Sequence, residues 1–183
     1  MPRLVLASQS PRRREILTSA GLEYTVRVTP VEEVRAPGES PEAYVRRLAT
    51  AKAEASWLGQ DEVVLGADTI VVLDQEVLEK PRDVADARRM LTLLSGREHA
   101  VITGICLRHA GGGKVDSVIT KVKFAPLSDA EIELYANSGE PLDKAGAYAI
   151  QGFASKFVER IDGCFFNVVG LPVSLVYRYL QSL

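Results

Sequence analysis

Apolar residues recur along the chain with two different periods, which divide it into predicted strands and helices. Short runs rich in valine, isoleucine and leucine predict strands. These runs lie at 3–8, 24–28, 62–73, 76–81, 99–109, 114–125, 157–161 and 164–169. The run at 62–73 is apolar almost throughout, which is typical of a buried strand, and we expect a break at Gly66. The runs on either side of 110–113 (AGGG) predict a long antiparallel hairpin.

Helix-start signals stand between these runs. Ser10-Pro11 and Ser40-Pro41 each combine an N-cap residue with a proline at the first helical position. Asp83 predicts a third start, Pro172 opens a last helix, and SDAE at 128–131 is a capping box. Helical spacing predicts that two groups of apolar residues face the core: Ile16, Leu17 and Ala20 in the first helix, and Tyr44, Leu48, Ala51 and Ala55 in the second.

Helices and strands therefore mix along the whole chain, which predicts an α/β protein with a mixed sheet and helices packed on it. The length of 183 residues, with 46% hydrophobic residues, suits one domain over residues 1–183 with two lobes. The formal net charge of −2 argues against a nucleic-acid partner. No apolar run approaches the length of a membrane span, and no signal peptide is visible. Cys106 and Cys164 have the character of reduced core cysteines, which favours a cytoplasmic protein.

The stretch LASQSPRRREIL at 6–17 places arginines on the first turn of a helix. A helix start carries a partial positive charge, so adding Arg12 and Arg13 there costs about 0.3–1 kcal/mol each when they are exposed. A polyphosphate reverses that cost, because it accepts bonds from backbone N–H groups, from the Ser8 and Ser10 hydroxyls and from guanidinium groups. The alternative is that Ser10 and Pro11 only start the helix and that the arginines are solvated.

A second candidate group centres on Asp68 in LGADTIVV at 65–72. A buried carboxylate needs a partner such as a metal ion, a lysine or backbone N–H groups, and Thr69 stands beside it with a hydroxyl. Lys52, Lys80 and Glu33 are further candidates, although each taken alone is more often a solvated surface residue. The usual Walker, GxGxxG, HExxH and GxSxG patterns are missing.

Taken together, three blocks resemble the Maf family of septum-formation-inhibitor-like nucleotide pyrophosphatases. The blocks are LASQSPRRREIL, GADTIVVLDQEVLEKPRD, and DKAGAYAIQG followed by IDGCFFNVVGLP. They occur in order from residue 4 to residue 173, so the resemblance covers nearly the whole chain. It implies an elongated, two-lobed fold like that of the inosine triphosphate pyrophosphatases, with a central cleft, and a homodimer.

The resemblance also implies an activity. It indicates hydrolysis of nucleoside triphosphates to monophosphate and pyrophosphate with a divalent cation, Mg²⁺ or Mn²⁺, and AGAYAIQG is similar to the branch that prefers dTTP and UTP. Asp68 falls on the proton acceptor, and the specificity positions fall on Arg12, Thr69 and Gln151. Further polar positions of the site fall on Ser8, Arg13, Glu33, Lys52 and Lys80.

The residue chemistry agrees with such a reaction and leaves some roles open. Phosphoryl transfer relies on positioning and on positive charge, which the arginines and lysines supply. Asp68 and Glu33 are the candidate metal ligands, and Asp68 either activates water or holds the metal. Two alternatives to a dTTP/UTP pyrophosphatase stand: a purine (ITP/XTP) pyrophosphatase, and a nucleotide sensor that regulates septation without turnover.

Overall fold

The computed structural model describes residues 3–59 and 61–183 and divides the chain into two compact units. The first unit contains segments 1–69, 103–118 and 170–183. The second unit contains segments 70–102 and 119–169. Each unit is therefore assembled from stretches that are far apart in the sequence.

A seven-stranded sheet is the framework of the chain, with the order β2-β1-β3-β5-β6-β7 and with β4 paired to β3. The strands are β1 (Arg3–Leu6), β2 (Thr25–Val26), β3 (Glu62–Leu73), β4 (Glu76–Leu78), β5 (Glu98–His109), β6 (Gly112–Phe124) and β7 (Val158–Asp162). Strand β1 runs parallel to β2 and β3, whereas β4 pairs with β3 and β7 pairs with β6 in antiparallel register. The predicted mixed α/β class is confirmed.

In the residues that the structure describes, six α-helices and three short 3₁₀ turns complete the fold. The helices are α1 (Pro11–Ser19), α2 (Pro41–Ser56), α3 (Val84–Leu94), α4 (Asp129–Ala136), α5 (Phe165–Val169) and α6 (Val173–Gln181). The turns are η1 (Glu140–Asp143), η2 (Ala145–Ala147) and η3 (Phe153–Phe157). Most predicted caps are present: Ser40 and Asp83 accept from backbone N–H groups of their helices, and Ser128 with Glu131 forms the predicted capping box.

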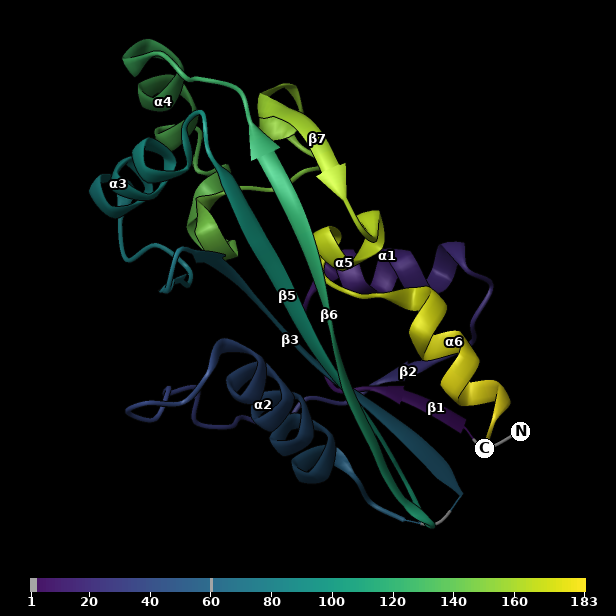
Figure 1. Cartoon of the computed structure of the whole chain (residues 1–183). Helices are drawn as coiled ribbons and strands as arrows, with labels where there is room; N and C mark the ends of the chain where they lie inside the picture. The colour runs from purple at the N-terminus through teal and green to yellow at the C-terminus, as the bar shows by residue number, and fades with distance from the viewer. Residues whose placement is uncertain (1–2, 60) are drawn as a thin grey trace. The chain divides into compact units, whose positions relative to one another are not determined.

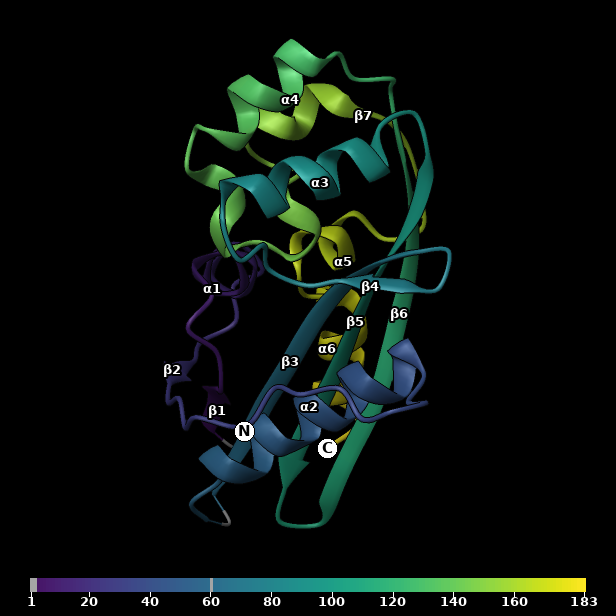
Figure 2. The same cartoon turned by 90° about the vertical axis from the view of Figure 1, so that its left-hand side faces the viewer.

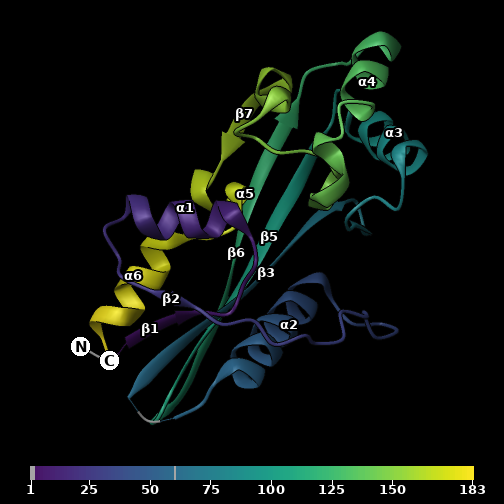
Figure 3. The same cartoon turned by 180° about the vertical axis from the view of Figure 1, so that it is seen from behind.

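In the first unit, helices cover both faces of the sheet. Helix α2 lies on one face, and α1 and α6 lie on the other (Figures 1 and 3). Within this unit, the helices bury every position of β3 except Thr69, which is half-buried.

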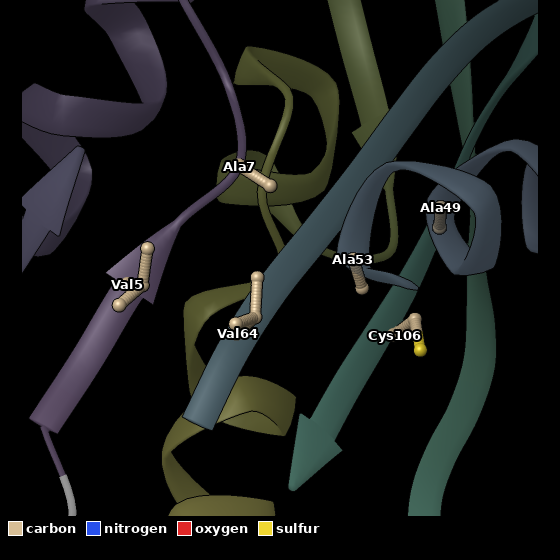
Figure 4. Packing of buried hydrophobic residues seen from close by; sticks show 6 residues of the cluster. All are labelled: Val5, Ala7, Ala49, Ala53, Val64 and Cys106. Atoms are coloured by element: carbon tan, nitrogen blue, oxygen red, sulfur yellow. The ribbon is translucent and has the colours of Figure 1, made fainter. Parts of the chain in front are cut away.

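Helix α2 packs very closely on β3 and on β5, because each of these strands has a glycine at the contact. A Cβ atom added at Gly66 would lie 2.8 Å from the Ala53 backbone nitrogen, and one at Gly104 would lie 2.7 Å from that of Arg46. Strand β3 continues through Gly66, so the predicted break there is wrong: this glycine allows the helix to approach. Val5, Ala7, Val64 and Cys106 form the floor on which Ala49 and Ala53 of α2 pack (Figure 4).

Several predicted core positions change as a result. Ala49 and Ala53 are buried, whereas the predicted Ala51 is half-buried and Ala55 is exposed. In α1, Ile16 and Leu17 are buried as predicted, but Ala20 is exposed because the helix has already ended at Ser19. In α2 the glycine contacts select a different buried face from the predicted one, and in α1 the helix ends before the last predicted residue. Neither effect is visible in apolar spacing alone.

The second unit is built around an aromatic cluster and a pair of helices. Helices α3 and α4 lie side by side (Figure 2). In the same unit, His99 contacts Phe124 and Tyr148 edge to face, at ring-centroid distances of 5.1 and 5.4 Å. The His99 Nε2 atom lies 2.7 Å from the Tyr148 hydroxyl, and burial lowers the pKa of His99 to about 4. This histidine is a neutral core residue of the second unit.

The strand predicted at 164–169 is wrong, because this segment forms helix α5. Its phenylalanines and valines favour a strand locally, but tertiary contacts override that preference. The buried Asn167 side chain donates to the Val101 carbonyl at 3.1 Å and to Thr120 Oγ1 at 2.9 Å. Within the described residues, no helix combines the length and the apolar character required to cross a membrane.

Candidate active site

The arginine-rich start of α1 follows directly from the end of β1. Strand β1 ends at Leu6, the segment 7–10 turns, and α1 begins at Pro11 with Ser10 as its N-cap residue. The Ser10 side chain makes no capping hydrogen bond. Instead, the Ser10 N–H donates to the buried Ser8 Oγ at 3.2 Å. Both predicted serines therefore lie at a helix N-terminus, where the backbone favours an anion.

Arg13 lies buried beneath this helix start and binds oxygen atoms of the protein itself. Its Nη1 donates to Ser8 Oγ and to the Ala67 carbonyl, each at 3.0 Å. Its Nε donates to the Gly170 carbonyl at 2.8 Å, and its Nη2 donates to Thr69 Oγ1 at 3.0 Å. These four bonds use four of the five N–H donors of a guanidinium. Arg13 therefore connects α1 to β3 and to the segment before α6, in contrast to Arg12, which is half-buried, and Arg14, which is exposed.

The charge of Arg13 is balanced at a distance. Burial lowers the pKa of the Arg13 guanidinium, and the carboxylates of Asp68 and Glu33 oppose that effect. Two of the predicted site acids are thus electrostatically coupled to the one arginine that is buried in this helix.

Thr69 belongs to the same network. Its Oγ1 accepts from Arg13, lies 2.9 Å from Thr103 Oγ1 and lies 3.3 Å from the Gly170 carbonyl. The predicted residues Ser8, Arg13 and Thr69 are therefore brought together by the fold. The sequence did not predict that Thr103 and Gly170 belong to this network. A threonine in the otherwise apolar run at 99–107 was the available signal for Thr103, whereas Gly170 contributes only a backbone carbonyl, for which a sequence carries no signal.

A second group forms around Lys52 of α2. Its Nζ lies 2.6 Å from Asp68 Oδ1 and 2.7 Å from Glu33 Oε1, so one ammonium bridges both carboxylates. The Lys52 and Asp68 side chains are 15% and 11% exposed, against 49% for Glu33. Asp68 thus has the lysine partner that its buried position requires.

The alternation of β3 explains this division into two groups. Successive side chains of a strand point to opposite faces. Asp68 shares its face with Val64 and Gly66, against which α2 packs, and therefore reaches Lys52. Thr69 points to the other face and reaches Arg13 of α1.

Glu33 reaches Lys52 from the loop between β2 and α2. The buried Tyr44 of α2 donates its hydroxyl to the Glu33 carbonyl at 3.1 Å. Arg47 of the same helix donates to the Val34 carbonyl at 2.9 Å and binds Glu39. Helix α2 therefore supplies both the lysine and the supports of the loop that carries the second acid.

Two predicted residues belong to the second unit. Lys80 follows β4 and is exposed. Gln151 is also exposed and stands in a turn between η2 and η3. Among residues 3–59 and 61–183, no three side chains of histidine, cysteine, aspartate and glutamate gather closely enough to hold a metal ion by themselves.

Comparison with known proteins assigns a relationship along the whole chain. The family model described as "Maf-like protein" matches residues 3–183. A "dTTP/UTP pyrophosphatase" of Anaeromyxobacter dehalogenans strain 2CP-C is 56% identical over 177 residues, covering 94% of this chain and 90% of the relative. A "dTTP/UTP pyrophosphatase" of Vibrio cholerae is 54% identical and covers 93% of this chain and 92% of the relative.

A likeness to solved structures supports the fold alone. The Ham1 protein of Staphylococcus aureus superposes with a TM-score of 0.52 at 14% sequence identity, covering 98% of both chains. The predicted likeness in architecture therefore extends along the chain, although few residues are identical.

Proposed function

Since the chain belongs to the Maf-like protein family, we propose that it is a nucleoside triphosphate pyrophosphatase that hydrolyses dTTP and UTP. The products are the nucleoside monophosphate and pyrophosphate. Support comes from relatives with that activity in their names, which are more than half identical over at least nine-tenths of both chains. In the structure, the observation that carries the proposal is the bridge from Lys52 to Asp68 and Glu33, which places a cation and two acids together.

In the proposed reaction, a water oxygen forms a bond to the α-phosphorus while the bond to the pyrophosphate oxygen breaks. Asp68 is the proposed proton acceptor for that water, or a ligand of the metal. Before substrate binds, Lys52 neutralises Asp68 and Glu33. The oxygen atoms of a triphosphate carry more negative charge than a carboxylate, so the Lys52 ammonium turns toward the triphosphate. The Asp68 carboxylate is then left to orient water.

Asp68 and Glu33 also suit a divalent cation that arrives with the nucleotide. Their carboxylates already converge on one cationic group, the Lys52 ammonium. Mg²⁺ characteristically binds through one or two carboxylates plus substrate phosphates, so a site with two acids fits it better than a cage made by the protein alone. When bound, Mg²⁺ or Mn²⁺ would neutralise phosphate charge in the transition state.

The remaining residues have proposed roles in binding. Ser8, Ser10, Arg12 and the N-terminus of α1 hold phosphate oxygens, and Lys80 adds positive charge. Arg13 contributes by fixing Ser8 and Thr69. Thr69 and Gln151 read the pyrimidine, since a hydroxyl and a carboxamide both donate and accept hydrogen bonds.

We also propose that residues 1–183 act as one functional domain. The family model spans both units, and the segments of the units interleave along the chain, so neither unit is a contiguous piece. A homodimer follows from the family resemblance. A cytoplasmic location agrees with two unpaired cysteines, Cys106 and Cys164.

The first test is a substrate panel of dTTP, UTP, CTP, ITP and 7-methyl-GTP. Pyrophosphate and monophosphate are measured with Mg²⁺ or Mn²⁺ and again after chelation. We expect metal-dependent cleavage of dTTP and UTP well above the others. Preference for ITP would instead indicate a purine enzyme, and calorimetric binding without product would indicate a nucleotide sensor.

The Asp68→Asn variant tests the catalytic assignment. It keeps the size of the side chain and removes the proton acceptor, so we expect kcat for dTTP to fall by about 10³-fold with the fold retained. Asp61→Asn is the matched control, because Asp61 is an exposed acid just before the same strand. Wild-type turnover by Asp68→Asn would remove Asp68 from the chemistry.

A further inference from the structure

Gln151 stands near the tip of a tight turn in the second unit. The Gly152 N–H donates to the Ala149 carbonyl at 3.2 Å, which closes the turn over Ile150 and Gln151. Ile150 is buried, whereas Gln151 is exposed. The direction of the Gln151 carboxamide therefore depends on how the two ends of this turn are held.

Two side chains from the end of α4 and the start of η1 hold those ends. Glu140 Oε1 accepts from the Phe153 N–H at 3.2 Å, just after the turn. The Tyr135 hydroxyl accepts from the Ala149 N–H at 3.3 Å, at the start of the turn. Burial raises the pKa of Tyr135, and the Glu140 carboxylate raises it further, so the Tyr135 hydroxyl stays protonated. The Tyr135 ring also stacks on that of Phe153, with centroids 5.5 Å apart and planes 5° from parallel.

Gly152 completes this support because it leaves room for the carboxylate. A Cβ atom added at Gly152 would lie 2.6 Å from Glu140 Cδ and 2.9 Å from Oε2. A side chain at position 152 would thus meet the end of Glu140 before anything else. The Glu140 carboxylate therefore packs directly against the backbone of the turn at Gly152.

We propose that Glu140, together with Tyr135, is a positioning residue that sets the placement of Gln151 and thereby the discrimination between nucleobases. This inference rests on the proposed function, in which Gln151 reads the pyrimidine. Glu140 acts through the backbone of residues 149–153, without contact to the reacting atoms. Its effect belongs to the choice of base and not to the hydrolytic step.

The primary test compares Glu140→Ala with Glu140→Gln. The alanine variant loses the acceptor for the Phe153 N–H, whereas glutamine keeps an oxygen in the same place. For Glu140→Ala we expect the ratio of kcat/KM for dTTP to that for ITP to fall about tenfold, mainly through KM for dTTP. For Glu140→Gln we expect a ratio within about twofold of wild type. Glu159→Gln is the charge-matched control, because Glu159 is an exposed residue of β7 in the same unit.

Gly152→Ala gives a second test that leaves Glu140 chemically intact. The added methyl group displaces the flexible end of Glu140, so this variant should lose base discrimination as Glu140→Ala does. In the Glu140→Ala background the methyl group meets no carboxylate, and Gly152→Ala should then have no further effect. Combining Glu140→Ala with Gln151→Ala should likewise give no greater loss than Gln151→Ala alone, because both changes remove the same interaction.

The outcomes separate this inference from the proposed function. If the wild-type protein cleaves no nucleotide, the proposed function fails. If the wild type prefers dTTP and Glu140→Ala keeps that preference, the positioning role is wrong. An equal fall of kcat/KM for dTTP and ITP, with a lowered Tm, would show a merely structural role and would also overturn the inference.

Discussion

In the first unit, the charged side chains of Arg13 and Lys52 join the predicted site residues to one another. In the second unit, the turn that carries Gln151 is held by hydrogen bonds from its backbone to two side chains. In the first unit, Arg13 and Lys52 each bind several groups from distant parts of the chain. In the second, Glu140 and Tyr135 hold only the backbone that flanks Gln151. Residues of the first kind cannot change without loss of stability, while those of the second can alter selectivity at little cost in folding.

Two glycines test this difference most strongly. A Cβ atom at Gly66 meets the backbone of α2, whereas one at Gly152 meets the end of a side chain. We expect Gly66→Ala to lower the free energy of unfolding by roughly 4 kcal/mol, because a helix must move. Gly152→Ala should cost about 1 kcal/mol or less. Urea unfolding measures both, with Gly59→Ala as the control, since a Cβ atom there meets nothing within 4 Å.

Comparing neighbouring arginines tests whether Arg13 is structural. Arg13→Met removes one donor group from four acceptors, three of which belong to buried residues, and we expect a loss of about 3 kcal/mol in unfolding free energy. Arg14→Met removes an exposed charge from the same helix and should change stability by less than about 0.5 kcal/mol. Equal stabilities for the two variants would contradict the structural role of Arg13.

Acid should affect the second unit before the first. His99 has a pKa of about 4 in the folded protein against 6.5 when unfolded, so the unfolded chain binds the extra proton between these values. Stability is therefore lost as pH falls below about 6.5, by about 2 kcal/mol between pH 7.5 and pH 5. In the first unit, hydrogen bonds from Arg27 lower the pKa of Glu62 to about 2, so that pair survives to lower pH.

Urea unfolding across this pH range checks the expectation with His99→Gln, which cannot titrate. The variant should show a flatter dependence of unfolding free energy on pH than the wild type. If both proteins lose stability in parallel between pH 7.5 and pH 5, another group is responsible.

Much of the fold could be predicted from local signals. The helix starts at Pro11 and Pro41 follow from a proline in the first turn, and the starts at Pro41 and Val84 follow from the capping side chains of Ser40 and Asp83. These effects act within a single turn. The error at 164–169 has the opposite cause. There, the local preference of Phe165, Phe166 and the valines for a strand lost to the distant partners of Asn167.

The candidate site was predicted at the level of residue types and less well at the level of roles. A buried acid requires a partner, so the sequence predicted a site at Asp68. It did not single out Lys52 from the other lysines, because that choice depends on the packing of α2 on β3. Arg12, Arg13 and Arg14 look alike in the sequence. The structure separates them into half-buried, buried and exposed residues, and the buried Arg13 meets acceptors of β3 and of residue 170.

By itself, the sequence determined most of the order of the elements, the family and the chemical groups available for a triphosphate. These depend on periodicity, caps and motifs that lie within a few residues of one another. Tertiary structure decided that Asp68 and Thr69 serve opposite faces of β3, that Arg13 is a structural hub, and that Glu140 lies against Gly152. Each of these depends on atoms brought together from distant positions, which no local pattern specifies.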